Sequence, residues 1–339
     1  MSEIYFLAEI GVNHEGSQDL AIEMIRTASI AGANGVKFQC YKAETLAAIN
    51  SPSYWDTKKE NEKSQYSLFQ KHEKFELEFY LPLIQECKKN KIDFVVTCFD
   101  QELVNIFDRY VPFHKISSSD ITNLPLIEHI ITKKKPIVLS TGASSLEEIR
   151  SSVEFIRSKT QIKLTILHCV LNYPCAFENA NIRMIDTLQS FLKEYNVEVG
   201  YSCHVPIPEG TDCLISAIER GAIFIEKHFT NSRLKKGNDH YHAMTAEDLK
   251  LFRDKEKFLN IIKGTGKPNL EIQNIARKNA RRGVYAAKSI DVDETITFKH
   301  LSILRPTNKI EPSEINQIIG KKALKKIIKG EALEKIFFE

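Results

Sequence analysis

Residues 197–204 read VEVGYSCH: a short run of apolar and β-branched residues ends in serine, cysteine and histidine. Seven further runs of this kind occur in the first three-quarters of the chain, at 4–10, 35–41, 92–99, 113–119, 136–142, 163–169 and 222–229. Strands that are apolar on both faces are typical of a parallel sheet covered by helices on both sides. Eight such strands alternating with helices predict an α/β protein with a (β/α)8 TIM barrel.

Longer amphipathic segments separate these runs, for example at 18–31, 76–90, 145–159, 181–194 and 246–262. Their apolar residues recur at the spacing of a helix that packs one face against a sheet. No glycine-rich loop of the G-x-G-x-x-G or Walker type follows any of the strand-like runs. The sequence therefore favours the barrel over an open nucleotide-binding sheet.

The chain is expected to hold two domains joined by a linker. Residues 1–264 form the predicted barrel, 265–280 the linker, and 281–339 a small module that is strand-like first and partly helical later. The basic stretch at 321–330 has apolar residues at helical spacing, so we expect the solvated face of an amphipathic helix there. The long polar connection at 42–75 is predicted to be a surface excursion that acts as a lid or a substrate wall.

The bulk composition is that of an ordinary globular protein. The 339 residues are 42% hydrophobic and 27% charged, and the net charge is +3. The basic residues are spread along the chain, so we expect no nucleic-acid partner. No apolar run approaches the roughly 20 residues of a membrane helix, and the first residues lack the basic region of a signal peptide. The seven cysteines show no metal-ribbon spacing, which fits reduced thiols in the cytoplasm.

Polar residues gather where the predicted strands end. They are Glu9, Lys37, Gln39, Thr97, Lys115, Ser118, Asp120, Ser140, Thr141, His168, Ser202, His204, Glu226 and His228. In a barrel of this kind the chemistry lies at the carboxyl ends of the strands. Lysines and glutamates have little reason to interrupt apolar strands unless they face a solvated site or one another.

These residue types have a shared chemistry. Two lysines together with several hydroxyl groups suit a phosphate or carboxylate ligand. Histidines at the ends of two neighbouring strands suit a divalent cation with open positions for water or substrate. Glu9 and Asp120 are candidates for moving a proton or orienting a hydroxyl group. Taken singly, each has a structural alternative: a salt bridge for a lysine, a helix cap for Ser140 or Thr141, and a core position for His168.

Several motifs together resemble a known family. They are AEIGVNHEGS, GVKFQCYKAETL, HKISSSDITNLPLI, VLSTGASSLEEI, LHCVLNYP, VGYSCH and IEKHFT. In order and spacing they resemble the nonulosonic acid synthases, which are the sialic acid (N-acetylneuraminate) synthases and their legionaminic and pseudaminic acid relatives. The tail, RRGVYAAKSIDVDETITFKHLSILRP, resembles the antifreeze-like SAF domain that ends members of this family.

The resemblance implies a reaction. Members condense phosphoenolpyruvate (PEP) with the open-chain aldehyde of an N-acylated hexosamine, of the N-acetylmannosamine or 2,4-diacetamido-6-deoxymannose type. The product is a nine-carbon 2-keto-3-deoxy acid, and phosphate is released by C–O cleavage. A divalent cation is implied, typically Mn²⁺ with Mg²⁺ or Co²⁺ as alternatives, held by the residues matching His204 and His228.

Individual roles follow by position in the matching motifs. PEP binding falls on Lys37, Thr97, Lys115, Ser118, Ser140, Tyr173 and Ser202. Sugar binding falls on Gln39, Asp239 and Arg305, and the catalytic residues are Glu9, Asp120, His204 and His228. In the family the tail arginine reaches the sugar across a domain-swapped homodimer, so a homodimer is implied here.

The chain departs from the family pattern at several positions. Cys98 replaces a proline, Asp120 a glutamate and Cys203 an aspartate, while GNDH (237–240) replaces GPDH. Cys203 is either a soft metal ligand or an apolar filler, because successive strand residues point to opposite faces. ITNLPL and the FD after the third strand favour the sialic and legionaminic branch over the pseudaminic one. A metal-dependent hydrolase or aldolase on the same barrel, or a weakened sugar-binding relative, are the remaining alternatives.

Overall fold

The computed structural model describes residues 4–55, 57, 58, 60–74, 76–237 and 239–339. The excursion predicted at 42–75 therefore includes three residues outside this description, and Asn238 of the GNDH turn lies outside it as well. The chain divides into two compact units, Met1–Ile262 and Lys263–Glu339. Each unit has an apolar core of its own.

The first unit is built on eight parallel strands. They are β1 (Tyr5–Gly11), β2 (Gly35–Cys40), β3 (Asp93–Cys98), β4 (His114–Ile116), β5 (Ile137–Ser140), β6 (Leu164–Cys169), β7 (Glu198–Cys203) and β8 (Phe224–His228). Hydrogen-bonded neighbours follow the order β3-β2-β1-β8-β7-β6-β5-β4. The two end strands of this order, β3 and β4, also lie against each other, so the sheet forms a nearly closed ring. This confirms the predicted TIM-barrel fold class.

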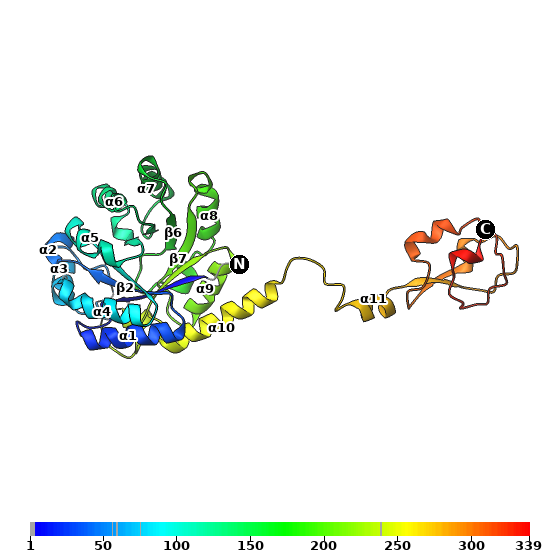
Figure 1. The fold of residues 1–339 in the computed structure, drawn as a ribbon, viewed down its shortest axis with the longest axis horizontal. Coiled ribbons are helices and arrows are strands. Elements are labelled where there is room, and N and C mark those ends of the chain that lie inside the picture. The colour runs from blue at the N-terminus through cyan, green and yellow to red at the C-terminus, as the bar shows by residue number, and fades with distance from the viewer. Residues whose placement is uncertain (1–3, 56, 59, 75, 238) are drawn as a thin grey trace. The chain divides into compact units, whose positions relative to one another are not determined.

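Helices surround the strands on the outside (Figure 1). They are α1 (Gln18–Ala31), α2 (Ala43–Leu46), α3 (Gln65–His72), α4 (Leu77–Lys89), α5 (Gln101–Phe107), α6 (Leu124–Ile131), α7 (Leu146–Lys159), α8 (Met184–Phe191), α9 (Glu209–Glu219) and α10 (Ala246–Lys263). Short polar side chains cap several of them. Ser17 accepts a hydrogen bond from Leu20 at the start of α1, and Ser145 forms a capping box with Glu148 at the start of α7.

The interior of the barrel is apolar at its amino-terminal end. Its buried layer consists of Leu7, Val95, Phe113, Val138, Leu167 and Phe224. Gly200 takes the corresponding place in β7, where an added Cβ would lie 2.3 Å from the carbonyl oxygen of Phe224. Because side chains on a strand alternate between faces, the next inward residue of each strand lies one layer closer to the carboxyl ends. The apolar layer therefore closes the bottom of the barrel and leaves the upper layer for polar side chains.

The fourth strand is shorter than the run at 113–119 predicted. It ends at Ile116, and a 3-10 turn, Ser118–Asp120, follows at once. The hydroxyl group of Ser117 accepts a hydrogen bond from the backbone of Ser119, and this local bond turns the chain where the sequence pattern predicted further strand.

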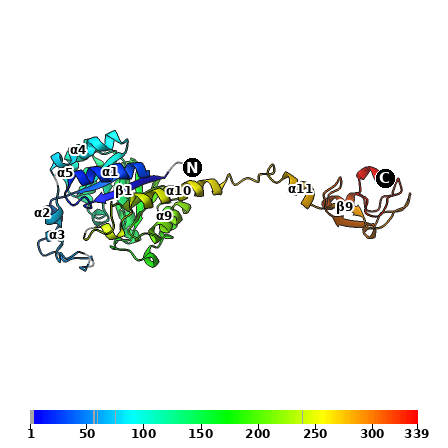
Figure 2. The ribbon, with the colours of Figure 1, turned by 90° about the horizontal axis from the view of Figure 1, so that it is seen from below.

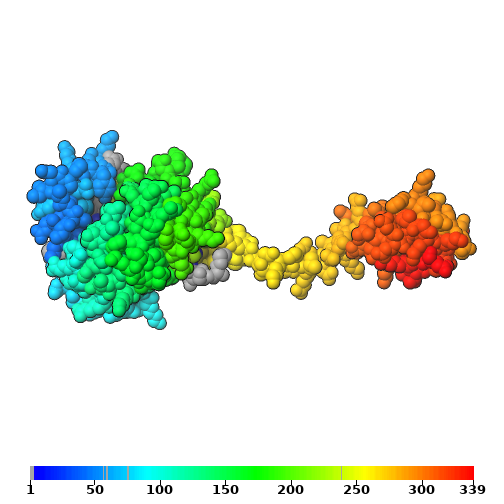
Figure 3. Space-filling view, turned by 90° about the horizontal axis from the view of Figure 1, so that it is seen from above, coloured from blue at the N-terminus to red at the C-terminus, as the bar shows by residue number. Residues whose placement is uncertain are grey.

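The connection after β2 lies next to the carboxyl end of β8, because Tyr54, Trp55 and Phe69 line one cavity together with His228. It holds α2 and α3, and an isolated bridge joins Pro52 to Ser64 between them. Both helices lie at one edge of the barrel unit in Figure 2. Figure 3 shows the blue surface of this early part of the chain beside the green surface of later strands and helices.

The second unit is built around an antiparallel pair, β9 (Gly283–Ala286) and β10 (Leu301–Leu304), and α11 (Asn274–Ala280) precedes this pair. The helix predicted at 321–330 is wrong. Ala323 and Ile327 are buried there, but isolated bridges pair them with Phe338 and Ile290 across the unit. The two buried apolar residues, four positions apart, therefore pair with distant segments of the unit and do not form one face of a helix. Within the described part of the chain, no helix has both the length and the apolar character needed to cross a membrane.

Candidate active site

The polar residues at the strand ends share the inward face of the barrel. In β1, β4 and β8 they follow the apolar layer by two residues: Glu9 after Leu7, Lys115 after Phe113, and Glu226 after Phe224. The same period of two brings in Thr97, Ser140 and Ser202 from the other strands. The alternation of the strands thus converts a scattered set of sequence positions into one polar layer.

One half of this layer is an ion pair on β1 and β2. The ammonium group of Lys37 lies 2.6 Å from Oε2 of Glu9 and 3.3 Å from Oγ1 of Thr97. Gln39 donates to Oε1 of Glu9 at 2.8 Å. Burial raises the pKa of Glu9, while the carboxylates of Glu9 and Glu226 outweigh the effect of burial on Lys37 and raise its pKa. Glu9 and Lys37 thus form a buried ion pair in which each group strongly affects the pKa of the other.

The other half joins β4, β5, β7 and β8. Lys115 donates to Oγ of Ser140 at 2.7 Å and lies 3.5 Å from Oε2 of Glu226. Ser202 donates to Oε1 of Glu226 at 3.2 Å. Burial alone would raise the pKa of Glu226, but Lys115 and Lys37 together lower it. Burial lowers the pKa of Lys115. Two lysines and two acidic residues are therefore paired within this buried layer.

A cluster of imidazole rings lies above the polar layer. The ring centroids of His204 and His228 are 5.4 Å apart, and Tyr173 packs against both, at 4.2 and 5.9 Å. Nδ1 of His204 donates to the carbonyl oxygen of Val170 at 2.8 Å, since a carbonyl can only accept. Burial lowers the pKa of His204 to about 4, so the neutral ring keeps a lone pair on Nε2.

Asp239 lies beside this cluster on the loop after β8. Its Oδ2 is 3.4 Å from Nδ1 of His228. The side chain of Asn13 holds the loop, because it accepts from the backbone N–H of Asp239 at 3.1 Å and donates to the carbonyl of Phe229 at 3.0 Å. Burial, with a smaller effect of Glu9, raises the pKa of Asp239 to about 7.

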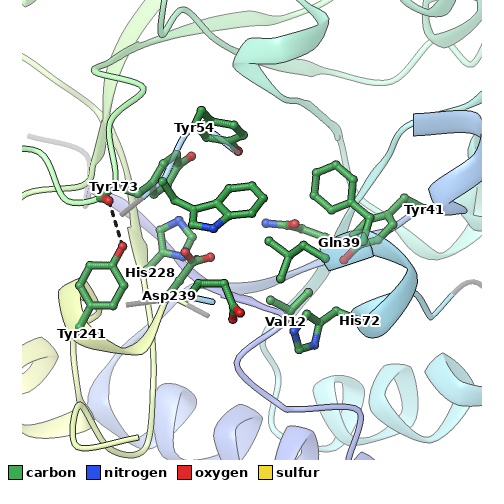
Figure 4. Close-up of a pocket in the computed structure, with 13 residues that line it drawn as sticks. Val12, Gln39, Tyr41, Tyr54, His72, Tyr173, His228, Asp239 and Tyr241 are labelled. Atoms are coloured by element: carbon green, nitrogen blue, oxygen red, sulfur yellow. Dashed lines mark hydrogen bonds and ion pairs between the residues drawn. The ribbon is translucent and has the colours of Figure 1, made fainter. Parts of the chain in front are cut away.

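Two chambers open at this end of the barrel. The inner chamber, about 50 Å³, is lined by Glu9, Lys37, Gln39, Thr97, Phe99, Lys115, Ser117, Ser118, Ser140, Cys169, Leu171, Tyr173, Ser202, His204, Glu226 and His228. The outer chamber, about 120 Å³, is lined by Val12, Gln39, Tyr41, Tyr54, Trp55, Glu60, Leu68, Phe69, His72, Tyr173, His228, Asp239 and Tyr241. Figure 4 shows His228 and Asp239 side by side in the outer chamber, near the hydrogen bond from Tyr241 to Tyr173. The chambers share Gln39, Tyr173 and His228, so a ligand could extend through both.

The chain matches the NeuB family model over residues 24–268 and the SAF domain model over 281–335. The chain belongs to the NeuB family. The N,N'-diacetyllegionaminic acid synthase of Legionella pneumophila is 31% identical over 97% of this chain and 93% of its own length, and that of Campylobacter jejuni is 32% identical over 96% and 97%. The solved structure of an N-acetylneuraminic acid (sialic acid) synthetase from Leptospira borgpetersenii, in complex with citrate, is 30% identical. Its TM-score is 0.68, and the match covers 82% of this chain and 93% of that one.

These matches confirm the family, the SAF domain and the enzyme class that the motifs predicted: the chain is a NeuB-family synthase of the nonulosonic acid type. The barrel brings most of the predicted site residues together. Those in the inner chamber are Glu9, Lys37, Gln39, Thr97, Lys115, Ser118, Ser140, Tyr173, Ser202, His204 and His228, and Asp239 lines the outer chamber. Their individual roles remain predictions.

Two predicted residues of the NeuB-family chain are not among those that line the two chambers. Asp120 sits in the 3-10 turn after β4 and accepts hydrogen bonds from Asn123 and Ser119, and neither chamber is lined by it. Arg305 follows β10 in the second unit, with an exposed side chain.

Cys203 points away from both chambers. It is buried in the apolar layer between the strands and the helices, as is Cys98. Because Ser202 and His204 face inward, the residue between them must face outward. The interpretation of Cys203 as an apolar filler therefore fits the structure, and the interpretation as a metal ligand does not.

The structure distinguishes between the site role and the structural role that were both open for Ser140 and His168. Ser140 is the last residue of β5 and accepts from Lys115, while Ser145 caps the following helix. His168 does behave as a core histidine, because its Nε2 bonds the carbonyl of Ala180 and its ring stacks on Tyr201.

Sequence reasoning missed roles for Glu226, Asn13 and His242. Glu226 was visible as a charged residue inside an apolar run, and it proves to be the partner of Lys115. Asn13 stands in the motif AEIGVNHEGS, but only the fold shows that it holds the loop of Asp239. His242 lies on a loop without periodicity, so no pattern could have placed it in the histidine cluster.

The donor set fits a divalent cation. Ligand atoms of His228, Asp239 and His242 lie within 4.8 Å of one another. Nδ1 of His228 and both ring nitrogens of His242 are buried and have no hydrogen-bond partner within the described part of the chain. Buried polar atoms are normally paired, so this combination of imidazole and carboxylate groups indicates a cation site.

Proposed function

We propose that this NeuB-family chain condenses PEP with the open-chain aldehyde of an N-acylated hexosamine to a nine-carbon 2-keto-3-deoxy acid. The observation that supports this most strongly is the inner chamber. There, Lys37 and Lys115 lie in one cavity with six hydroxyl-bearing side chains and open onto the histidine cluster. The reaction of a metal-dependent hydrolase would not explain why two lysines line this cavity.

PEP carries two anionic groups, and the chamber offers two cationic positions. Lys115 with Ser140 forms one, and Lys37 with Thr97 forms the other. Each ammonium group supplies point charge, and each hydroxyl group supplies a neutral donor. The carboxylates of Glu226 and Glu9 contact the same two lysines, so PEP must compete with them for the ammonium groups.

The reaction forms one carbon–carbon bond and breaks one carbon–oxygen bond. C3 of PEP attacks the aldehyde carbon, which leaves positive charge at C2 and an alkoxide that takes up a proton. Water adds to C2, and phosphate then leaves the tetrahedral intermediate with the oxygen that joined it to C2. We propose that Glu9 moves a proton in these steps, because its buried carboxyl group has a raised pKa and lies between Lys37 and Gln39.

The sugar is proposed to occupy the outer chamber. Tyr54, Trp55 and Phe69 from the excursion after β2 line it, which supports the predicted role of this segment as a substrate wall. Asp239 and Gln39 supply polar groups for sugar hydroxyls. The matches to diacetyllegionaminic acid synthases favour a 2,4-diacetamido-6-deoxymannose-type sugar over N-acetylmannosamine, and this branch over the pseudaminic one.

A divalent cation, Mn²⁺ with Mg²⁺ or Co²⁺ as alternatives, is proposed to be held by His204 and His228. When bound, it would act as a Lewis acid toward the aldehyde oxygen. We further propose the domain-swapped homodimer, in which Arg305 reaches the sugar bound to its partner, and a role for Asp120 near the attacking water. Seven free cysteines support the predicted cytoplasmic location.

The test is release of inorganic phosphate from PEP in the presence of Mn²⁺, with N-acetylmannosamine and 2,4-diacetamido-2,4,6-trideoxymannose compared side by side. We expect sugar-dependent release, faster with the diacetamido sugar. Lys115→Met should raise the KM for PEP at least about tenfold, since a charged hydrogen bond to an anion is lost. Lys159→Met is the matched control, because Lys159 pairs with Glu128 on the surface. Absence of sugar-dependent phosphate release would exclude the proposal.

A further inference from the structure

A third histidine completes the ring cluster of the proposed active site. The ring centroid of His242 lies 4.8 Å from that of His228 and 6.1 Å from that of His204. Tyr173 packs against it at 5.6 Å, as it does against the other two rings. His242 belongs to the short 3-10 helix His240–His242 after β8 and has no exposed surface.

Among the residues that the structure describes, the imidazole of His242 has no hydrogen-bond partner at either nitrogen. A buried polar group without a partner destabilises the fold, so a buried ring with two such atoms indicates a ligand that pairs with them. Nε2 is 4.0 Å from Oδ1 of Asp239, beyond hydrogen-bonding distance. A cation between the two groups would satisfy both.

The backbone holds His242 at this place. The buried ammonium group of Lys227 donates to the carbonyl of His242 at 2.9 Å and to that of Val205 at 2.6 Å. Two residues further on, the backbone N–H of Met244 donates to the carbonyl of His228 at 2.7 Å. The loop is thus fixed to β8 on one side and to the end of β7 on the other.

The spacing is close to that of a loaded site. The ligand atoms of His228, Asp239 and His242 lie within 4.8 Å of one another. Two atoms that each bind an ion at about 2.1 Å are at most about 4.2 Å apart. Small rotations of the side chains would therefore bring all three onto one ion.

We propose that His242 and Asp239 are ligands of the divalent cation together with His204 and His228, giving a site of three imidazoles and one carboxylate. The inference concerns the same site as the proposed function and names its full ligand set. Imidazole nitrogen binds Co²⁺ and Zn²⁺ more strongly than it binds Mn²⁺. A third imidazole therefore shifts the preference of this chain toward Co²⁺ and Zn²⁺, relative to the same site with two.

Metal binding by the full-length, metal-free protein tests this without any substrate. Co²⁺ and Mn²⁺ are titrated by calorimetry, and the Co²⁺ complex is also followed by its visible absorption. In His242→Ala and His242→Gln we expect Co²⁺ to bind at least about tenfold more weakly, Mn²⁺ to change less, and the Co²⁺ band to change shape. His240→Gln is the matched control from the same turn, since that ring bonds Thr230 at 2.8 Å. Unchanged Co²⁺ affinity and spectrum in both His242 variants would overturn the proposal.

X-ray absorption of the Co²⁺-loaded wild-type protein tests whether His242 binds the ion even if the variants do not fold. Multiple scattering from imidazole rings reports how many of them bind the ion. Three are expected, and two or fewer would contradict the assignment of His242. Because these measurements involve neither PEP nor sugar, a chain that binds Co²⁺ through His242 but makes no nonulosonic acid would contradict the proposed function alone.

Discussion

At the scale of single residues, strand alternation decides which side chains take part in chemistry. Cys203 stands between Ser202 and His204, which line the inner chamber, yet it is buried among the apolar side chains outside the barrel. A departure from the family motif that looks serious in sequence therefore falls outside the site.

Cys203→Ala tests this directly. We expect turnover and metal affinity to stay within about twofold of wild type, while the free energy of unfolding falls by about 1 kcal/mol because a buried sulfur is replaced by a small void. The measurements are steady-state kinetics, Co²⁺ titration and denaturant unfolding. A changed metal preference would show that Cys203 does reach the ion.

A second prediction concerns His14, which is buried against Phe38 and Phe79. Burial, with smaller effects of Lys74 and His72, lowers the pKa of His14 to about 4, below its ordinary value of 6.5. Between these two values the unfolded chain binds the extra proton and the folded chain does not. Stability therefore falls as pH falls from about 6.5 to about 4, by up to about 3 kcal/mol from this group.

The measurement is the unfolding free energy as a function of pH, for wild type and His14→Asn. In this window the unfolding free energy of the variant should depend less steeply on pH. The difference in slope is at most the contribution of one proton, about 1.4 kcal/mol per pH unit. Equal slopes for the two proteins would show that His14 titrates normally in the fold.

At the scale of elements, repeating patterns were readable and loops were not. The eight strands follow from short apolar runs, and the polar layer follows from their ends, because a barrel brings all carboxyl ends to one mouth. The predicted end of β4, at residue 119, was too late. The hydrogen bond from Ser119 to Ser117 that turns the chain is local, and no periodic pattern in the sequence indicates it. Sequence reasoning also missed His242 and Asn13, whose positions depend on how the loop after β8 is held.

The excursion after β2 carries a prediction of its own. Trp55 lines the outer chamber but not the inner one. Trp55→Ala should therefore raise the KM for the sugar about tenfold, through lost aromatic contact area, while the KM for PEP changes little. Trp55→Phe is the control and should retain most of the affinity. Equal effects on both substrates would place the sugar elsewhere.

At the scale of the whole molecule, the proposed dimer requires the SAF unit of one subunit to act on the barrel unit of its partner. The site lies in the barrel unit, whereas Arg305 lies in the SAF unit. If Arg305 acts on the partner's barrel, subunits carrying Arg305→Ala and Lys115→Met are each weak alone but complement each other. Random mixing in co-expression should restore about a quarter of the wild-type sites. No recovery above the single variants would exclude action across the dimer.

The reaction itself is tested most directly with PEP that carries ¹⁸O in the oxygen bridging C2 and phosphorus. The protein is incubated with this PEP, 2,4-diacetamido-2,4,6-trideoxymannose and a divalent cation, and both products are analysed by mass spectrometry. C–O cleavage predicts a nine-carbon 2-keto acid without the label and an equal amount of phosphate that carries it. Phosphate without the label, or no nine-carbon acid at all, would contradict the proposed synthase reaction.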